Sequence, residues 1–192
     1  MKRFLTFTFI LLLTACAQDG SYSGPMRTPN YSQYGITRLN VNQIQIVNSY
    51  IPPYHDPNVE HTLYLPPYVA LRDWAQNRFQ SVGNMGVAKI EILDASIVRS
   101  GLPVKDDFMS FFNDQVSTQY RMQVKVRITI ISPRFDNQPY AEVTVNKMLQ
   151  TYQSTSLASR DAQLHDMVTS MVAQVNKLMT TELQNKLPDM IE

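Results

Sequence analysis

The chain has 192 residues, with 17 basic and 16 acidic side chains and a formal net charge of +1. This near balance argues against nucleic acid as a partner, because nucleic-acid-binding domains carry a marked excess of basic residues. The length is enough for one core without disulfide support, and the single cysteine cannot form an internal disulfide. We therefore expect one domain and a different role for the cysteine.

The N-terminus has the layout of a secretory signal. Lys2 and Arg3 precede a mainly apolar run at residues 4–13, and small residues follow it. This run is too short to cross a bilayer as a helix, which needs about 20 residues. Residues 1–15 are therefore predicted to be a signal peptide. Its cleavage leaves 15 basic residues against the 16 acidic ones, a formal charge of −1.

The sequence LTAC at residues 13–16 gives the lone cysteine a role. It resembles the lipobox of bacterial lipoproteins, in which the cysteine becomes the acylated first residue. The resemblance implies covalent lipid on Cys16, and several acyl chains hold a protein on a membrane far more stably than one. Ala17 stands where an Asp commonly marks inner-membrane retention, so the resemblance implies anchoring to the outer membrane with the domain in the periplasm. An ordinary cleaved signal with an incidental cysteine is the alternative.

Polar and turn-forming residues dominate the stretch behind the cysteine. Residues 17–40 are rich in Gln, Ser, Gly, Pro, Tyr and Asn and show no sustained apolar period. The composition predicts a lipidated flexible tether at residues 16–40, followed by a single domain at 41–192. A flexible coil of this length spans roughly 25–30 Å, so the domain is expected to hang clear of the membrane surface.

The domain opens with a short strand pattern. Ile44 and Ile46 share one parity within residues 41–51, which predicts the first strand. The loop at residues 52–67 contains five prolines, which prevent regular structure through most of its length. We expect this loop to be solvated.

A helix and a second strand follow. Apolar residues at helical spacing predict a first helix at residues 67–82, with Trp74 and Phe79 packing inward and Gly83 ending it. Alternating apolar residues at 87–98 predict the second strand.

Residues 116–131 carry the strongest pattern in the chain, a strict alternation that predicts a strand with one dry and one wet face. A fourth strand is predicted at residues 139–153. Its parity becomes unclear at Asn146 and Lys147, which is compatible with a β-bulge. A loop at residues 99–113 precedes these two strands.

The chain ends with a long amphipathic pattern that predicts a helix at residues 157–186. The element order is therefore βαβββα. It predicts an α/β protein of the α+β type: a two-layer sandwich with a four-stranded mixed sheet and two helices on one face. Met167, Met171 and Met179 lie in the apolar stripe of the last helix, where core packing and a soft groove for an acyl chain are both open readings.

Side chains that could carry chemistry are few. His55, Asp56, Glu60 and His61 offer metal-ligand atoms, but their spacing fits no helical pair, and a solvated loop explains them as well. His165 is expected to be half-exposed beside the stripe of the last helix. No convergent catalytic set, glycine-rich phosphate loop or metal motif emerges, so we expect a protein that is not an enzyme.

Basic residues gather on one predicted strand face. Arg121, Lys125 and Arg127 point to the wet side of the third strand, with Lys147 beside them on the next strand. These four residues are candidate contacts for the anionic head groups of lipopolysaccharide. An ordinary solvated sheet face is the alternative.

Together, the LTAC motif, the tether and the βαβββα order resemble the LptE-like lipopolysaccharide-assembly lipoproteins. They also resemble the auxiliary lipoproteins of ABC-type lipid transporters, the PqiC group. The LRDWAQNRF stretch and the terminal helix are similar in character only, and the loop at 52–67 departs from both groups. LptE-like proteins plug and help assemble an outer-membrane β-barrel.

The resemblance implies a membrane-anchored accessory subunit of envelope lipid or lipopolysaccharide transport or assembly. Its expected partners are the membrane, through the lipid anchor, and an envelope complex, either an outer-membrane barrel or a lipid transporter, with lipid or lipopolysaccharide as a ligand. Two alternatives remain: a stand-alone periplasmic lipid-binding module, and a structural or secretion-system lipoprotein of the pilotin kind.

Overall fold

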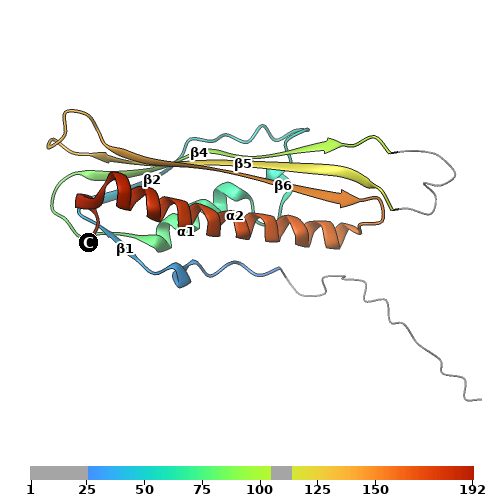
Figure 1. Cartoon of the computed structure of the whole chain (residues 1–192), viewed down its shortest axis with the longest axis horizontal. Helices are drawn as coiled ribbons and strands as arrows, with labels where there is room; N and C mark the ends of the chain where they lie inside the picture. The colour runs from blue at the N-terminus through green and yellow to red at the C-terminus, as the bar shows by residue number, and fades with distance from the viewer. Residues whose placement is uncertain (1–25, 105–113) are drawn as a thin grey trace, which may run out of the picture.

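The computed structural model describes residues 26–104 and 114–192, so Cys16 and the predicted signal peptide lie outside the described residues. A four-stranded sheet forms one layer, and two helices cover one of its faces (Figure 1). The elements of these layers are β2 (Gln43–Asn48), α1 (Pro67–Arg78), β4 (Val87–Gly101), β5 (Val116–Ile131), β6 (Tyr140–Tyr152) and α2 (Leu157–Lys186). The predicted α+β sandwich and its βαβββα order are confirmed.

The sheet has the strand order β2-β4-β5-β6. β2 runs parallel to β4, and the other two pairings are antiparallel, which makes the sheet mixed. Apolar residues on the helix-facing side of the central strands, such as Ile90, Val124 and Ile128, are completely buried. Polar residues alternate with them on the other side, which we call the outer face. The strict alternation of apolar and polar residues in β5 therefore determines which face of this strand lies against the helices.

α2 is the largest element of the helix layer and has the bounds that the sequence pattern predicts. The Ser156 side chain caps its N-terminus by accepting a hydrogen bond from the backbone N–H of Ser159. Met167, Met171 and Met179 are buried in the core. Their position supports core packing, the simpler of the two readings open for these methionines.

α1 ends at Arg78, earlier than the predicted helix. Phe79 already has extended backbone and begins β3 (Phe79–Ser81), which pairs in parallel with β1 (Thr37–Leu39). The predicted helical continuation to residue 82 is therefore wrong, because hydrogen bonding to β1 outweighs the local apolar spacing. Trp74 and Phe79 do point inward, and their rings meet edge to face at 5.4 Å between centroids.

The segment before β2 belongs to the folded body. Tyr31, in a 3₁₀ turn at Tyr31–Tyr34, is 4% exposed, and Leu39 in β1 is completely buried. The backbone N–H of Asn40 donates to the carbonyl of Met190 at 2.9 Å. The predicted boundary at residue 41 is too late, because isolated apolar side chains and a distant C-terminal partner hold this segment, and neither produces a local period.

The proline-rich loop is pinned to the sheet rather than solvated throughout. The backbone N–H of Arg99 donates to Pro57 at 2.8 Å, and that of Val59 donates to Ile97 at 2.9 Å. The loop thereby lies along the part of β4 that β2 does not reach. This anchoring gives the loop a fixed position despite its prolines.

A buried carboxylate reinforces that anchoring. Glu60 is completely buried and accepts hydrogen bonds from the Tyr50 hydroxyl at 2.5 Å and from the backbone N–H of Ile97 at 3.1 Å. Burial, together with the hydrogen bond to Glu60, raises the pKa of Tyr50 well above its ordinary value. Glu60 thus serves the structure of the loop.

β6 keeps a continuous register through the point where the sequence pattern is unclear. Asn146 pairs with Gln123 and Lys147 pairs with Met122, so no bulge occurs there. Because cross-strand partners share a face, Lys147 lies on the helix-facing side with Met122. The register shifts of the described sheet lie elsewhere, in β4 between Ile92 and Asp94 and in β5 between Val116 and Thr118.

Candidate functional site

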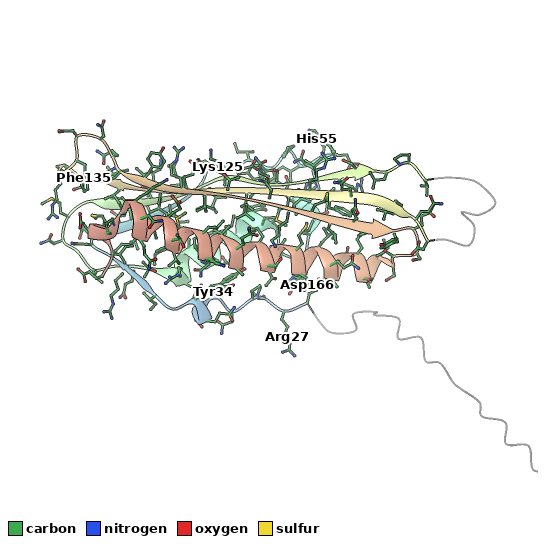
Figure 2. All side chains as sticks on the ribbon, in the orientation of Figure 1. Arg27, Tyr34, His55, Lys125, Phe135 and Asp166 are labelled. Carbon is green, nitrogen blue, oxygen red and sulfur yellow. The ribbon has the colours of Figure 1, made fainter. Side chains whose placement is uncertain are left out.

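The structure brings three of the four predicted head-group contacts together. Arg121, Lys125 and Arg127 lie on the outer face of β5, and Figure 2 shows Lys125 on the side of the sheet away from α2. Lys147 is the exception, because its register places it on the opposite face. The four residues therefore do not form one basic stripe.

Two of the three outer basic residues are engaged with an acidic partner. Lys125 Nζ and Arg127 Nη2 lie 3.0 and 2.6 Å from the carboxylate oxygens of Glu142. Partial burial alone would raise the pKa of Glu142, but hydrogen bonds and charge from both partners outweigh it and hold the pKa below its ordinary value. The Arg127 guanidinium also lies over the Tyr140 ring, 5.1 Å from its centroid.

Further acidic residues balance charge on the same face. Glu91 pairs across the sheet with Arg127 and forms an ion pair with Lys89 at 2.7 Å. Asp94 pairs with Lys125 across the sheet. The outer face thus carries mixed rather than uniformly positive charge, which favours a solvated sheet face over a strong anion-binding surface.

The histidines of the proline-rich loop do not converge on a common point. His55 is exposed at the periphery of the molecule, with its Nδ1 2.7 Å from the backbone oxygen of Asp56 (Figure 2). The His61 ring packs against Tyr54, with centroids 5.4 Å apart. In residues 26–104 and 114–192, no group of three or more His, Cys, Asp or Glu side chains is placed to hold a metal ion.

A cavity of about 180 Å³ lies where the first turns of α2 cover the far end of the sheet. We call it the end cavity. Its apolar walls include the buried side chains of Val59, Leu65 and Leu164. The proline-rich loop supplies the first two of these, so the anchoring of that loop on β4 also builds this site.

Polar groups from three elements enter the same cavity: Arg99 from β4, Tyr120 from β5, and Arg160 and His165 from α2. Arg99 lies across the sheet from Tyr120, which fixes these two side chains on the helix-facing side. Arg160 lies one turn before Leu164 on α2. The register and the helical repeat together bring the four groups to one place.

Each arginine in the cavity has one carboxylate partner among the described residues. Arg99 Nη2 lies 2.8 Å from Asp56, which is well exposed, and Arg160 Nη2 lies 2.8 Å from Asp161. The hydrogen bond to Asp161 raises the pKa of Arg160, desolvation opposes it, and Tyr120 adds to the increase. Each guanidinium carries five N–H bonds, so both retain donors beyond these contacts.

His165 is buried, with 9% of its surface exposed, so the prediction of a half-exposed position is wrong. Its Nδ1 is buried and has no hydrogen-bond partner among the described residues, and its ring lies 6.1 Å from that of Tyr64. The helical repeat explains the burial, since His165 precedes Val168 and Val172 by about one and two turns on the same face. The sequence spacing alone could therefore have predicted that His165 is buried.

A second cavity of about 320 Å³ shares Arg99, Tyr120 and Arg160 with the end cavity. It opens between the start of β5 and the end of β6. Tyr152 and Leu157 line it and are exposed, and Tyr64 is exposed at the first cavity. The arrangement places hydrogen-bond donors and positive charge where the partly apolar end cavity meets a second, mainly polar cavity with Tyr152 and Leu157 at its exposed edge.

Comparison with known proteins gives little further information. No family model matches the chain, and no curated protein matches it. Among solved structures, the chain is similar to a minor lipoprotein from Acinetobacter baumannii, with 11% sequence identity and a TM-score of 0.35. The match covers 74% of this chain and 93% of that chain. A likeness of this size carries no argument about the function of this chain.

Within the described part of the chain, no helix combines the length and the apolar character needed to cross a bilayer.

Proposed function

We propose that this chain is a bacterial lipoprotein anchored to the outer membrane through acylated Cys16. Its α+β body serves in the periplasm as a non-enzymatic accessory subunit of an envelope complex for lipid or lipopolysaccharide transport or assembly. The sequence LTAC at residues 13–16 supports the anchor, because it places a lone cysteine directly behind a short apolar run.

The attachment of the N-terminal segment to the body is the structural observation that carries the proposal. Met26 lines the end cavity, and Tyr31 is buried in the core. Arg78 Nη1 donates to the carbonyl of Gly35 at 3.2 Å, which ties the segment to α1. Figure 1 shows this blue segment running along the helix layer, on the side away from the sheet.

This attachment shortens the reach between anchor and body. Ten residue steps separate Cys16 from Met26, and a fully extended chain of that length covers at most about 35 Å, against about 84 Å for the 24 steps from Cys16 to Asn40. The body would therefore be held near the membrane surface, closer than a tether ending at residue 40 allows. A short reach suits a subunit that works beside a membrane-embedded complex.

β6 offers a surface for such a complex. It stands at one end of the strand order, so in the described part of the chain β5 is its strand neighbour and its other edge has none. An unpaired edge presents main-chain donors and acceptors that a strand of a partner protein can pair with. Met148 and Tyr152 of this strand are exposed.

The anchor is tested by replacing the cysteine. Cys16→Ala is expected to move the protein from the washed membrane fraction to the soluble periplasmic fraction and to abolish incorporation of labelled palmitate, with the melting temperature unchanged. Ser21→Ala, outside the LTAC motif, is the matched control and should behave as the wild type. A Cys16→Ala protein that still takes up palmitate and stays in the membrane would contradict the proposal.

The end cavity favours a second candidate function, a stand-alone periplasmic lipid-binding module. The two candidates differ in what accompanies the protein on gentle extraction. An accessory subunit should be recovered with a protein complex, whereas a stand-alone module should be recovered alone with bound lipid.

A further inference from the structure

The end cavity combines features that a packing defect would not require. Arg99, Tyr120, Arg160 and His165 come from β4, β5 and α2 and line one cavity, whose wall also holds the polar Thr62 and Asp161. The Nδ1 of the 91% buried His165 has no hydrogen-bond partner among the described residues, although buried polar groups in folded proteins are nearly always hydrogen-bonded. Because this nitrogen is covered by the surrounding protein, the partly exposed guanidinium groups of Arg99 and Arg160 are the donors that a ligand in the cavity can reach.

The charges around the cavity favour an anionic ligand group. The titratable and charged groups at or beside it are Arg99, Arg160 and His165 on one side and Asp56 and Asp161 on the other. Each aspartate occupies one arginine, but Asp56 is an exposed loop residue and Asp161 contacts Arg160 as its chain neighbour. The remaining guanidinium N–H groups and the phenol can still bind one acceptor together.

The size of the cavity limits the ligand. A cavity of 150 Å³ holds a molecule such as benzene, so about 180 Å³ holds a short alkyl segment but not a whole lipid. The adjoining cavity of about 320 Å³ shares both arginines, which places the cationic groups between the two spaces. The exposed Tyr64, Tyr152 and Leu157 provide apolar surface where the ligand would leave the protein.

We propose that the end cavity binds an amphiphile whose alkyl chain carries a carboxylate or phosphate group, with this group held between Arg99 and Arg160. This ligand site rests on the proposed function for its location in the cell envelope. Binding itself does not depend on Cys16, so a failed anchor and a failed ligand site give different results.

Photocrosslinking of the full-length protein in phosphatidylcholine nanodiscs tests the site. Three probes carry the same diazirine at the end of an eight-carbon chain: octanoate, octyl phosphate and neutral octanol. The anionic probes are expected to label residues 59–65 and 160–165, as mapped by peptide mass spectrometry, at a yield at least about tenfold above that of octanol. Comparing carboxylate with phosphate distinguishes a fatty-acid-type from a phospholipid-type ligand.

Variants assign the binding to the arginine cluster. Arg160→Gln should lower the labelling of these segments by about tenfold or more, because it removes charge-assisted hydrogen bonds. Tyr120→Phe keeps the buried ring and should lower labelling by about threefold. Arg134→Gln, at an exposed position in the turn between β5 and β6, is the matched control and should leave labelling unchanged. Thermal unfolding of every variant checks that the fold is intact.

Equal labelling of the cavity segments by octanol and the anionic probes would overturn the proposal, as would unchanged labelling in a folded Arg160→Gln protein. If Arg160→Gln does not fold, Tyr120→Phe decides, and an undiminished yield in that variant overturns the proposal. Labelling confined to residues outside the cavity would also overturn the proposal.

Discussion

A buried polar network between the two helices gives the sharpest stability prediction. The side-chain oxygen of Asn176 accepts hydrogen bonds from Trp74 Nε1 at 3.1 Å and from Arg78 Nε at 2.9 Å. Trp74 and Arg78 are both buried. Desolvation lowers the pKa of Arg78, whose hydrogen-bond acceptors among the described residues are neutral, including Thr180 at 3.4 Å. Asn176→Ala should therefore destabilise the protein through groups that lie on α1.

The expected loss follows from the two donors left without an acceptor. A buried donor that loses its partner costs about 1–3 kcal/mol, and the better helix propensity of Ala returns about 0.5 kcal/mol. Arg78 keeps its contact with Gly35, which limits its share. We expect Asn176→Ala to lower the free energy of unfolding by about 2–4 kcal/mol.

Urea denaturation followed by the fluorescence of Trp74, the single tryptophan, measures this loss. Gln174→Ala, at an exposed position of the same helix, is the matched control and should change stability by less than about 0.5 kcal/mol. Asn176→Asp keeps an acceptor and adds a charge opposite to that of Arg78, so it should be more stable than Asn176→Ala. An Asn176→Ala protein as stable as the control would refute the reasoning.

Three other changes give further tests. Ser156→Ala removes the N-cap of α2 and should cost about 1 kcal/mol in urea denaturation. Gly83→Ala would place a Cβ 2.7 Å from the backbone nitrogen of Val41, so some backbone must shift, and the melting temperature should fall with a loss of about 1–3 kcal/mol. Glu142→Gln removes a carboxylate whose pKa is depressed by its two basic partners, so it should reduce stability at neutral pH by up to about 1 kcal/mol.

The pH dependence of the Glu142 effect has a fixed sign. A carboxylate with a lowered pKa in the folded state stabilises the protein above its unfolded pKa, and this contribution is lost as the pH falls through the folded value. The difference between wild type and Glu142→Gln should thus shrink in acid and vanish below the depressed pKa. A difference that stays constant down to that pH would contradict the assignment. For Ser156→Ala and Gly83→Ala, a stability equal to that of the wild type would contradict the prediction.

Elements with a long, regular pattern could be predicted from the sequence. α2 and β5 have the predicted bounds, because each repeats its apolar period several times and the Ser156 cap marks where α2 begins. β1 and β3 could not be predicted, since each has three residues and depends on its partner strand for its hydrogen bonds. Phe79 also continues the apolar spacing of α1, which concealed the change to a strand.

The end cavity was beyond local pattern reasoning for a similar reason. Arg99 falls in the predicted loop at 99–113, whereas β4 extends to Gly101 through its pairing with β5. That pairing sets Arg99 opposite Tyr120 and turns both toward α2. Lys147 was assigned to the wrong face because a charged residue is normally expected on the solvated side of a sheet. It lies instead on the helix-facing side of the edge strand β6, where a long lysine side chain can extend to solvent.

Capture of partners from intact cells tests the central claim most directly. The C-terminally tagged protein, crosslinked in cells and purified from detergent-solubilised envelopes, should bring along an outer-membrane barrel or the subunits of a lipid transporter, as identified by mass spectrometry. Crosslinked peptides should include β6, if its open edge is the docking surface. Recovery of the protein alone, after crosslinking that captures other known envelope complexes in the same cells, would contradict an accessory-subunit role.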